Sequence, residues 1–213
     1  MPELMHLSVE DAIKLQQKMA KDVVKHDVID QQKIKHICGV DVSYRGNKAF
    51  SCAVVIERKS LAIVDSVCNE SRVESPYISG LLFLREAEPV LAVLEKLEHF
   101  YDLLMVDGHG LLHPRRFGVA CYIGMRVDKP TIGIGKSLLC GNVVERNSSK
   151  IVLLDGKKLG MVLKTNSKPI YVSIGHKISL RTAVKLVKEI TKYRMPEPLR
   201  LADINSRKMA MET

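Results

Sequence analysis

Aromatic residues are scarce in this sequence, and long hydrophobic runs are absent. It contains no tryptophan and only four phenylalanines, so an extended platform of aromatic side chains for stacking nucleic-acid bases is not expected. No tract approaches the length of about 20 apolar residues that a membrane-spanning helix needs. The stretch 1–11 also lacks the apolar segment of a signal peptide. We therefore expect a protein without membrane contact and with a cytoplasmic location.

The cysteines show no pattern of a metal site or of a disulfide framework. They are five in number, widely spaced, and without a Cys-x-x-Cys pair. Most of them lie among apolar residues, where a reduced cysteine behaves as a small hydrophobic side chain. We expect reduced thiols in the core or at the surface. The five residues are Cys38, Cys52, Cys68, Cys121 and Cys140.

Hydrophobic residues and positive charge are plentiful. The chain has 213 residues, of which 46% are hydrophobic, enough for one substantial domain. We expect a single domain over 1–213 that acts as a monomer. Residues 150–213 hold 14 Lys and Arg against 5 Asp and Glu, whereas residues 1–149 hold 19 of each. Such a basic region suits a polyphosphate partner, and ordinary solubility explains it equally well.

The hydrophobic pattern changes from strands to alternating strands and helices. Three strands are predicted at 34–44, 50–57 and 61–69, with turn residues 45–48 after the first, which indicates an antiparallel start. The other predicted elements are helices at about 8–24, 82–99, 117–125 and 180–193, and strands at 103–106, 130–134, 160–164 and 170–174. This order predicts an α/β fold in which helices flank a mixed sheet.

Three carboxylates have unusual neighbours. Asp41 lies inside a predicted strand, Asp107 follows the apolar run 103–106, and Glu86 lies near the start of a predicted helix. A single aspartate in a strand is most often at an edge or in a local ion pair. Two on neighbouring strands would converge, and Mg²⁺ or Mn²⁺ is a natural reason to gather such oxygens. A site of this kind can activate water for phosphodiester cleavage.

Two further polar residues suit that chemistry. His113 could position the attacking water or move a proton, and Lys136 could neutralise a phosphate oxygen. For each of them, an ordinary surface position is the alternative. Lys136 lies in Gly-x-Gly-Lys-Ser, but Pro130 occupies the place of the first glycine in a nucleotide-binding P-loop. That substitution argues against nucleotide hydrolysis.

Taken together, seven segments of the chain resemble the endonuclease V family. They occur in the family's order over about residues 8–210, nearly the whole chain, and so many ordered matches are hard to obtain by chance. The segments are GVDVSY (39–44), PYISGLL (76–82), RE (85–86), VDGHG (106–110), HPRRFG (113–118), PTIGIGKS (130–137) and PEPLRLAD (196–203).

The resemblance implies an RNase H-like fold and a repair endonuclease. Such an enzyme uses Mg²⁺, with Mn²⁺ as a substitute, on DNA that contains a deaminated purine such as deoxyinosine. It cuts the second phosphodiester bond 3′ to the lesion and leaves a 3′-hydroxyl and a 5′-phosphate. Carried over by position, Asp41, Glu86 and Asp107 would form the metal centre, and His113 and Lys136 would support the reaction. A fourth ligand could be Asp203, which could equally cap a helix.

The resemblance also implies how the base is recognised. A damaged base must leave the duplex to be examined, and weak inosine pairing lowers that cost. Tyr77 would wedge into the gap, although a turn tyrosine can also simply pack on the core. Backbone groups near Gly80, Leu82, Gly108 and Gly110 would read the hypoxanthine edge.

The chain departs from the family pattern at several positions. Ser79 replaces the second proline of the wedge segment, which should loosen that loop, and His109 stands where glutamine or asparagine is usual. Other functions stay open: cleavage of inosine-containing RNA, a silent binding module, and a nuclease selective for branched structures.

Overall fold

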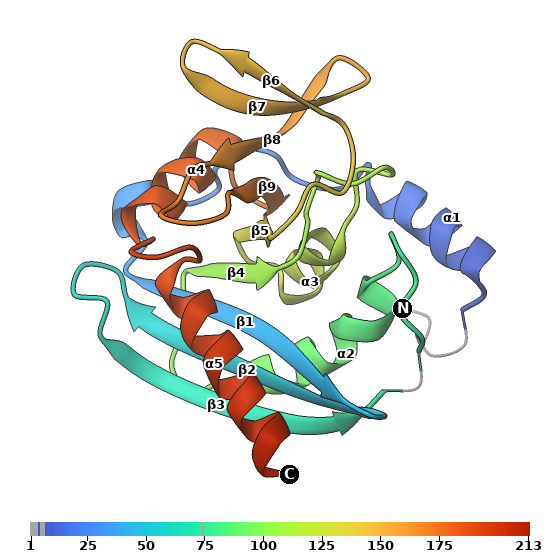
Figure 1. The fold of residues 1–213 in the computed structure, drawn as a ribbon, viewed down its shortest axis with the longest axis vertical. Helices are drawn as coiled ribbons and strands as arrows, with labels where there is room; N and C mark the ends of the chain where they lie inside the picture. The colour runs from blue at the N-terminus through green and yellow to red at the C-terminus, as the bar shows by residue number, and fades with distance from the viewer. Residues whose placement is uncertain (1–3, 5–6, 74) are drawn as a thin grey trace.

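The first three strands form an antiparallel meander (Figure 1). They are β1 (His36–Arg45), β2 (Lys48–Glu57) and β3 (Ile63–Arg72). The turn Gly46-Asn47 joins β1 to β2, and Gly46 adopts a positive φ of 60° that suits glycine. This computed structural model describes residues 4, 7–73 and 75–213. Part of the stretch 1–11 considered for a signal peptide, residues 1–3, 5 and 6, lies outside the described residues.

A mixed sheet organises the molecule. Within the described residues it has nine strands in the order β3-β2-β1-β4-β5-β9-β8-β7-β6. Strands β4 and β5 run parallel to β1, whereas β9 is antiparallel to β5 and the remaining strands continue antiparallel. The later strands are β4 (Leu103–Asp107), β5 (Thr131–Gly135), β6 (Asn142–Arg146), β7 (Ser149–Leu154), β8 (Lys157–Leu163) and β9 (Ile170–His176).

Helices cover the sheet. Helix α5 packs on β1 and β2, α2 packs on β2 and β3 and against α3, and α4 packs on β8 and β9. Helix α1 lies at one side of the molecule in Figure 1. The helices are α1 (Val9–Met19), the short 3₁₀ turn Gln31–Lys33, α2 (Phe83–Leu94), α3 (Val119–Val127), α4 (Leu180–Glu189) and α5 (Glu197–Glu212).

The predicted fold class is confirmed: this is an RNase H-like α/β arrangement with antiparallel first strands. Some boundaries differ. Helix α1 ends at Met19 rather than near 24, and α2 ends at Leu94 rather than at 99. The carboxylate of Asp65 accepts hydrogen bonds from the backbone N–H groups of Glu98 and His99, so those residues form a loop bound to β3. Helix α5 and the β6–β7 hairpin were not predicted.

The expectation that all five cysteines are reduced is wrong for two of them. Cys52 on β2 and Cys68 on β3 form a disulfide. The two residues are direct partners in the antiparallel ladder, with their Cα atoms 4.2 Å apart, and such a pairing brings the sulfur atoms together. Sequence spacing could not show that register. Cys38, Cys121 and Cys140 are free thiols, as expected.

A membrane-spanning helix was not expected, and the described part of the chain contains none that is long and apolar enough to cross a bilayer. Hydrophobic residues are used inside instead. Strands β4 and β5 are almost fully buried, as is usual for parallel strands covered on both faces. The carboxyl ends of β4 and β5 open onto the cavity described below.

Candidate active site

Asp41 and Asp107 lie side by side as a consequence of strand register. Strands β1 and β4 are parallel and paired up to Val40 and Val106, and the next residue in each strand is an aspartate. Asp203 reaches the same place from α5. Oxygens of Asp41, Asp107 and Asp203 lie within 4.8 Å of one another. The structure therefore brings together two of the three candidate ligands that the sequence suggested most strongly, Asp41 and Asp107, and also the fourth candidate, Asp203.

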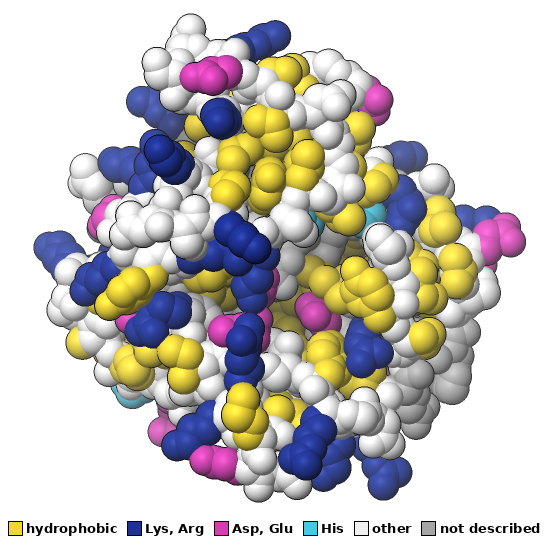
Figure 2. Space-filling model, in the orientation of Figure 1, with side chains coloured by type: hydrophobic (Ala, Val, Ile, Leu, Met, Phe, Trp, Pro, Cys, Tyr) yellow, Lys and Arg dark blue, Asp and Glu magenta, His cyan; other side chains and the backbone are white. Residues whose placement is uncertain are grey.

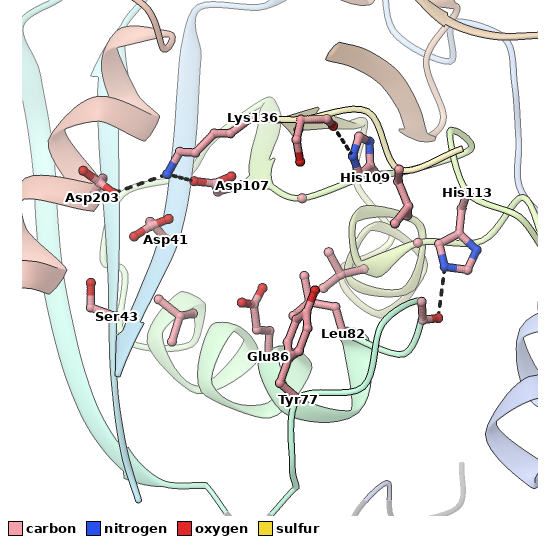
Figure 3. A pocket seen from close by; sticks show the side chains of 18 of the residues that line it. Asp41, Ser43, Tyr77, Leu82, Glu86, Asp107, His109, His113, Lys136 and Asp203 are labelled. Carbon is pink, nitrogen blue, oxygen red and sulfur yellow. Dashed lines mark hydrogen bonds and ion pairs between the residues drawn. The ribbon is translucent and has the colours of Figure 1, made fainter. Parts of the chain in front are cut away.

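Two cations balance these carboxylates. The Lys136 ammonium group, just beyond β5, lies 2.5 Å from Asp107 Oδ2 and 3.4 Å from Asp203 Oδ1 (Figure 3). Arg207, one helical turn after Asp203, donates to Asp203 Oδ1 at 2.9 Å. Although burial alone would lower the pKa of Lys136, the carboxylates of Asp107, Asp41 and Asp203 raise it. Lys136 is therefore a fixed positive charge at the cluster.

Serines that the sequence analysis did not single out hold Asp41 in place. Ser206 Oγ lies 3.0 Å from Asp41 Oδ2 and 2.8 Å from Ser43 Oγ. Burial, followed by the charge of Asp107, raises the pKa of Asp41. One signal could have revealed Ser206: it lies three residues after Asp203, so a helix places both on one face. The hydroxyl groups orient a carboxylate that has little access to water.

Glu86 faces the same cavity but stands apart from the cluster of three aspartates. It lies in the first turn of α2 and projects towards the cavity from below in Figure 3. Burial, then the charges of Asp107 and Asp41, raises the pKa of Glu86 well above its usual range. Its position suits a carboxylate that serves the centre from the opposite wall.

The cavity holds about 390 Å³ and connects this centre to the predicted recognition residues. Figure 2 shows it as a hollow with acidic groups inside and basic side chains along one rim. Tyr77, Gly80, Leu82 and Gly108 all line it. Tyr77 is 68% exposed, which does not fit the alternative of a tyrosine packed on the core. The volume lies within the range of small-molecule sites.

Gly110 does not line this cavity. Its N–H donates to Ser173 Oγ at 2.9 Å, and its carbonyl accepts from the Gly118 N–H at 3.0 Å. A Cβ atom at this position would lie 1.9 Å from the Ile174 carbonyl oxygen. Both backbone groups of Gly110 thus serve internal packing, and the glycine allows a close approach to β9. The predicted role in reading a base finds no support at this residue.

His113 lies at the far side of the cavity from the carboxylates (Figure 3). Its Nδ1 accepts from the Arg115 N–H at 3.2 Å, so Nε2 carries the proton and donates to the Gly80 carbonyl at 3.0 Å. Burial, then the charge of Arg115, lowers the pKa of His113 to about 4. His113 is thus a neutral ring with both nitrogens occupied. The structure does not bring it to the candidate metal ligands, where it was predicted to position the attacking water or move a proton.

His109, one of the departures, is also tied down. Its Nε2 contacts the Ser137 carbonyl at 3.0 Å, and burial lowers its pKa. A Cβ at residue 135 would lie 2.2 Å from the His109 ring, so Gly135 provides the space for this histidine. The fold therefore accommodates the His109 ring, in place of the usual glutamine or asparagine, and Asp107 keeps its place in the cluster.

These residues form an all-oxygen donor set at the edge of a mixed sheet. Carboxylate oxygens are the ligands that Mg²⁺ and Mn²⁺ prefer. The three carboxylates repel one another because they lie close together and partly buried. The charge of Lys136 offsets this repulsion only in part, so these residues suit a divalent cation. The fold and the site together define an RNase H-like α/β protein with a carboxylate centre suited to phosphodiester chemistry.

Comparison with known proteins identifies the family. The sequence profile of the family described as Endonuclease V matches residues 17–204. Endonuclease V of Thermofilum pendens is 45% identical over 204 residues, which cover 93% of this chain and 88% of the relative. The chain therefore belongs to the endonuclease V family.

Solved structures agree. Endonuclease V of Streptomyces avermitilis has 31% identity and a TM-score of 0.90, covering 100% of this chain and 97% of that chain. Endonuclease V of Ciona intestinalis, in complex with a 24mer DNA containing an inosine followed by a ribo-adenosine, has 30% identity and a TM-score of 0.83, covering 93% and 96%. The chain thus has the same overall fold as these endonuclease V structures.

Proposed function

We propose that this enzyme cleaves DNA at the second phosphodiester bond 3′ to a deoxyinosine, leaving a 3′-hydroxyl and a 5′-phosphate. One observation carries the proposal: the cluster of Asp41, Asp107 and Asp203 opens into a cavity large enough for a nucleobase. A site that joins acidic ligands to a base-sized cavity suits cleavage directed by a base. The related Ciona enzyme in complex with inosine-containing DNA supports the same substrate.

Mg²⁺, or Mn²⁺ in its place, would be held by Asp41, Asp107 and Asp203, and would supply Lewis-acid stabilisation of the phosphate and of an attacking water. The chain contributes the rest. Lys136 places a fixed positive charge beside Asp107, where it can balance a phosphate oxygen. Glu86 faces the cavity from α2 with a raised pKa, which suits a group that holds or moves a proton near the attacking water.

Recognition of the lesion takes place at the other end of the cavity. Tyr77, largely exposed at the rim, would fill the gap left by an extruded base. The cavity wall beside Leu82 and Gly108 would receive that base. Hypoxanthine carries a carbonyl where adenine carries an amine, so a backbone N–H in this wall would favour the deaminated base. We further propose that residues 1–213 act as one domain.

Inosine-containing RNA is a second candidate substrate. The nucleotide after the inosine in the Ciona complex is a ribo-adenosine, so a 2′-hydroxyl is accepted next to the lesion in that relative. The same catalytic centre would serve both substrates, and contacts to the 2′-hydroxyl would decide between them.

A cleavage assay tests both candidates. Labelled strands carry one deoxyinosine or one inosine, and matched strands carry adenine at that position. With Mg²⁺ we expect one product from the deoxyinosine strand, ending one nucleotide beyond the lesion, and none from the adenine strand or after chelation of the metal. Cleavage of lesion-free four-way junctions instead would indicate a structure-selective nuclease, and binding without any cleavage would indicate a binding module.

Asp107→Ala tests the catalytic centre. The change removes a ligand of the cluster and the partner of Lys136, so cleavage should fall by at least about 100-fold. Binding to the deoxyinosine strand should persist because the basic surface and Tyr77 are unchanged. Asp155→Ala is the matched control, since Asp155 is 75% exposed and does not line the cavity. Full activity of the Asp107 variant would exclude it as a ligand.

A further inference from the structure

A buried glutamine lies in the apolar face of α1. Gln16 is 1% exposed, and it occupies the helical position between Ile13 and Met19, three residues from each. An amide in such a place must find hydrogen-bond partners or destabilise the fold. Gln16 finds them on segments 64 to 101 residues away along the chain, and one of its partners, Gly80, lines the cavity. It also lies just before the part of the chain that the family profile matches.

The partners of Gln16 converge on one peptide group. The Gln16 side-chain N–H₂ donates to the carbonyl of Gly80 at 3.1 Å and to that of Phe117 at 2.7 Å. Its Oε1 accepts from Arg115 Nε at 2.6 Å. Arg115 in turn donates through Nη2 to the same Gly80 carbonyl at 2.6 Å, and His113 donates to it at 3.0 Å. We call Gln16, Arg115 and His113 the Gly80 clamp.

The clamp decides how the Gly80 peptide is oriented. Three donors occupy an oxygen that has two lone pairs, so this carbonyl has no capacity left to accept from a base. Gly80 adopts a φ of +77°, and a Cβ there would lie 2.9 Å from Arg115 Nη2. The backbone conformation and the clamp therefore require each other. Within the described residues this segment has a turn hydrogen bond from the Leu81 N–H to the Ile78 carbonyl at 2.9 Å, but no ladder hydrogen bonds between Tyr77 and the start of α2. The clamp therefore adds constraints from outside the segment.

The same segment carries two of the proposed recognition residues. Tyr77 precedes Gly80 by three residues and Leu82 follows it by two, and both line the cavity. A peptide fixed at the middle of so short a segment fixes the wedge and the pocket wall relative to each other. Ser79, which lacks the rigidity of a proline, makes an external constraint more important.

We infer that Gln16 is a positioning residue for base recognition, acting from α1 through the Gly80 clamp; this inference rests on the proposed function. It predicts a loss of lesion affinity rather than a loss of chemistry, because the clamp lies on the opposite side of the cavity from Asp41 and Asp107. It also assigns a role to α1, which contributes no residue to the metal centre.

The experiment compares Gln16→Leu with Met19→Ala and the unchanged enzyme. Leucine keeps the volume of Gln16 but removes its hydrogen bonds. Met19→Ala disturbs the packing of the same helix without touching the clamp. For Gln16→Leu we expect KM for the deoxyinosine strand to rise about tenfold or more, as for a slightly misplaced site, with kcat within about threefold. Binding to a lesion-free strand should stay unchanged. Met19→Ala should lower the melting temperature and leave KM unchanged.

Amide hydrogen exchange of segment 77–82 provides a readout that needs no activity. Gln16→Leu should accelerate exchange there, and Met19→Ala should not. If Gln16→Leu fails to fold, Arg115→Lys replaces it in the test. This change removes the guanidinium group that joins Gln16 to Gly80, so it should show the same two effects. Equal KM values in the Gln16 and Met19 variants, or unchanged exchange, would overturn the inference. If the unchanged enzyme does not cut deoxyinosine strands, the proposed function fails, and accelerated exchange alone then tests the clamp.

Discussion

Tyr77 is a large aromatic residue that the folded chain leaves 68% exposed, at the rim of the cavity. A side chain with this exposure adds little to stability, so a change there should alter binding and leave folding intact. Stacking of one base on an aromatic ring contributes about 1–3 kcal/mol.

Tyr77→Ala should therefore weaken binding to a deoxyinosine strand by roughly 5- to 150-fold, the equivalent of that stacking energy, and change binding to a lesion-free strand far less. Fluorescence anisotropy titrations measure both. Phe100→Ala is the matched control, because Phe100 is 66% exposed and does not line the cavity. Equal losses on both strands would show that Tyr77 serves general binding only.

His113 makes a prediction about pH and stability. Its pKa is lowered to about 4 by burial and Arg115, whereas an unfolded chain would have the usual value of about 6.5. The unfolded state therefore binds the proton first as the pH falls. His113 therefore leaves the free energy of unfolding unchanged above pH 6.5 and lowers it as the pH falls from 6.5 to 4. Below that range the loss reaches its maximum of about 3 kcal/mol.

His113→Gln cannot titrate and keeps a donor for Gly80. The difference in unfolding free energy between this variant and the unchanged protein should shift by up to about 3 kcal/mol from pH 7 to pH 4, in favour of the variant. Urea unfolding at a series of pH values measures it. A difference that is independent of pH would show that the ring is accessible to protons in the folded state.

At the scale of elements, the disulfide joins the two strands at the edge of the sheet. Cys52 and Cys68 are 16 residues apart in sequence, and closing a loop of this size in the unfolded chain stabilises the native state by about 3 kcal/mol. Cys52→Ala/Cys68→Ala should lower the unfolding free energy by about that amount, as should reduction of the unchanged protein. Cys140→Ala, at a free and partly exposed thiol, is the control. Five titratable thiols in the unreduced protein would exclude the bridge.

The elements that the sequence predicted are those with a clear hydrophobic pattern. Strands β1, β4 and β5 are apolar and bounded by turn residues, whereas the pairing and register of β1 and β4 come from the structure. Asp41 and Asp107 end up beside each other through this pairing alone. Their convergence could be predicted only on the condition that the two strands are neighbours, which the structure shows them to be.

Helix α5 was missed for a physical reason. It packs on the sheet through small residues, Ala202, Ser206 and Ala210, spaced four apart. Residue 39 beneath it is a glycine, and a Cβ there would lie 2.4 Å from the Pro198 backbone. Close packing of small residues leaves no stripe of large apolar side chains to detect. For the same reason, the sequence pattern could not decide between a metal ligand and a helix cap at Asp203.

The β6–β7 hairpin was missed because its first strand offers no buried face. The side chains of β6 are mostly exposed, so the alternation of apolar and polar residues is weak. Its turn is formed by Asn147 and Ser148, which both adopt a positive φ, as a two-residue hairpin turn requires.

The partners of Gln16 were equally beyond prediction, because they depend on contacts between segments 64 or more residues apart.

At the scale of the whole molecule, the structure shows where the basic last third of the sequence lies. The basic last third of the sequence forms the strands from β7 onward together with α4 and α5, and α5 supplies both Asp203 and Arg207 to the cavity. Basic side chains stand along one rim of the hollow in Figure 2. That placement favours a polyphosphate partner over a surface that is merely soluble. A monomeric state and a cytoplasmic location stay predictions.

The dependence of binding on salt tests this assignment. The logarithm of the binding constant for a lesion-free single strand should fall linearly with the logarithm of the salt concentration, with a slope of about −0.7 for each phosphate contact. Arg207 lines the cavity with a side chain that is 60% exposed, so Arg207→Gln should make the slope shallower by about 0.7. Lys14→Gln is the control, because Lys14 is 64% exposed, pairs with Glu10 and does not line the cavity. Equal slopes for the Arg207 variant and the unchanged enzyme would place the phosphate path away from α5. A slope near zero in all three proteins would show that the basic region does not bind phosphates and serves ordinary solubility.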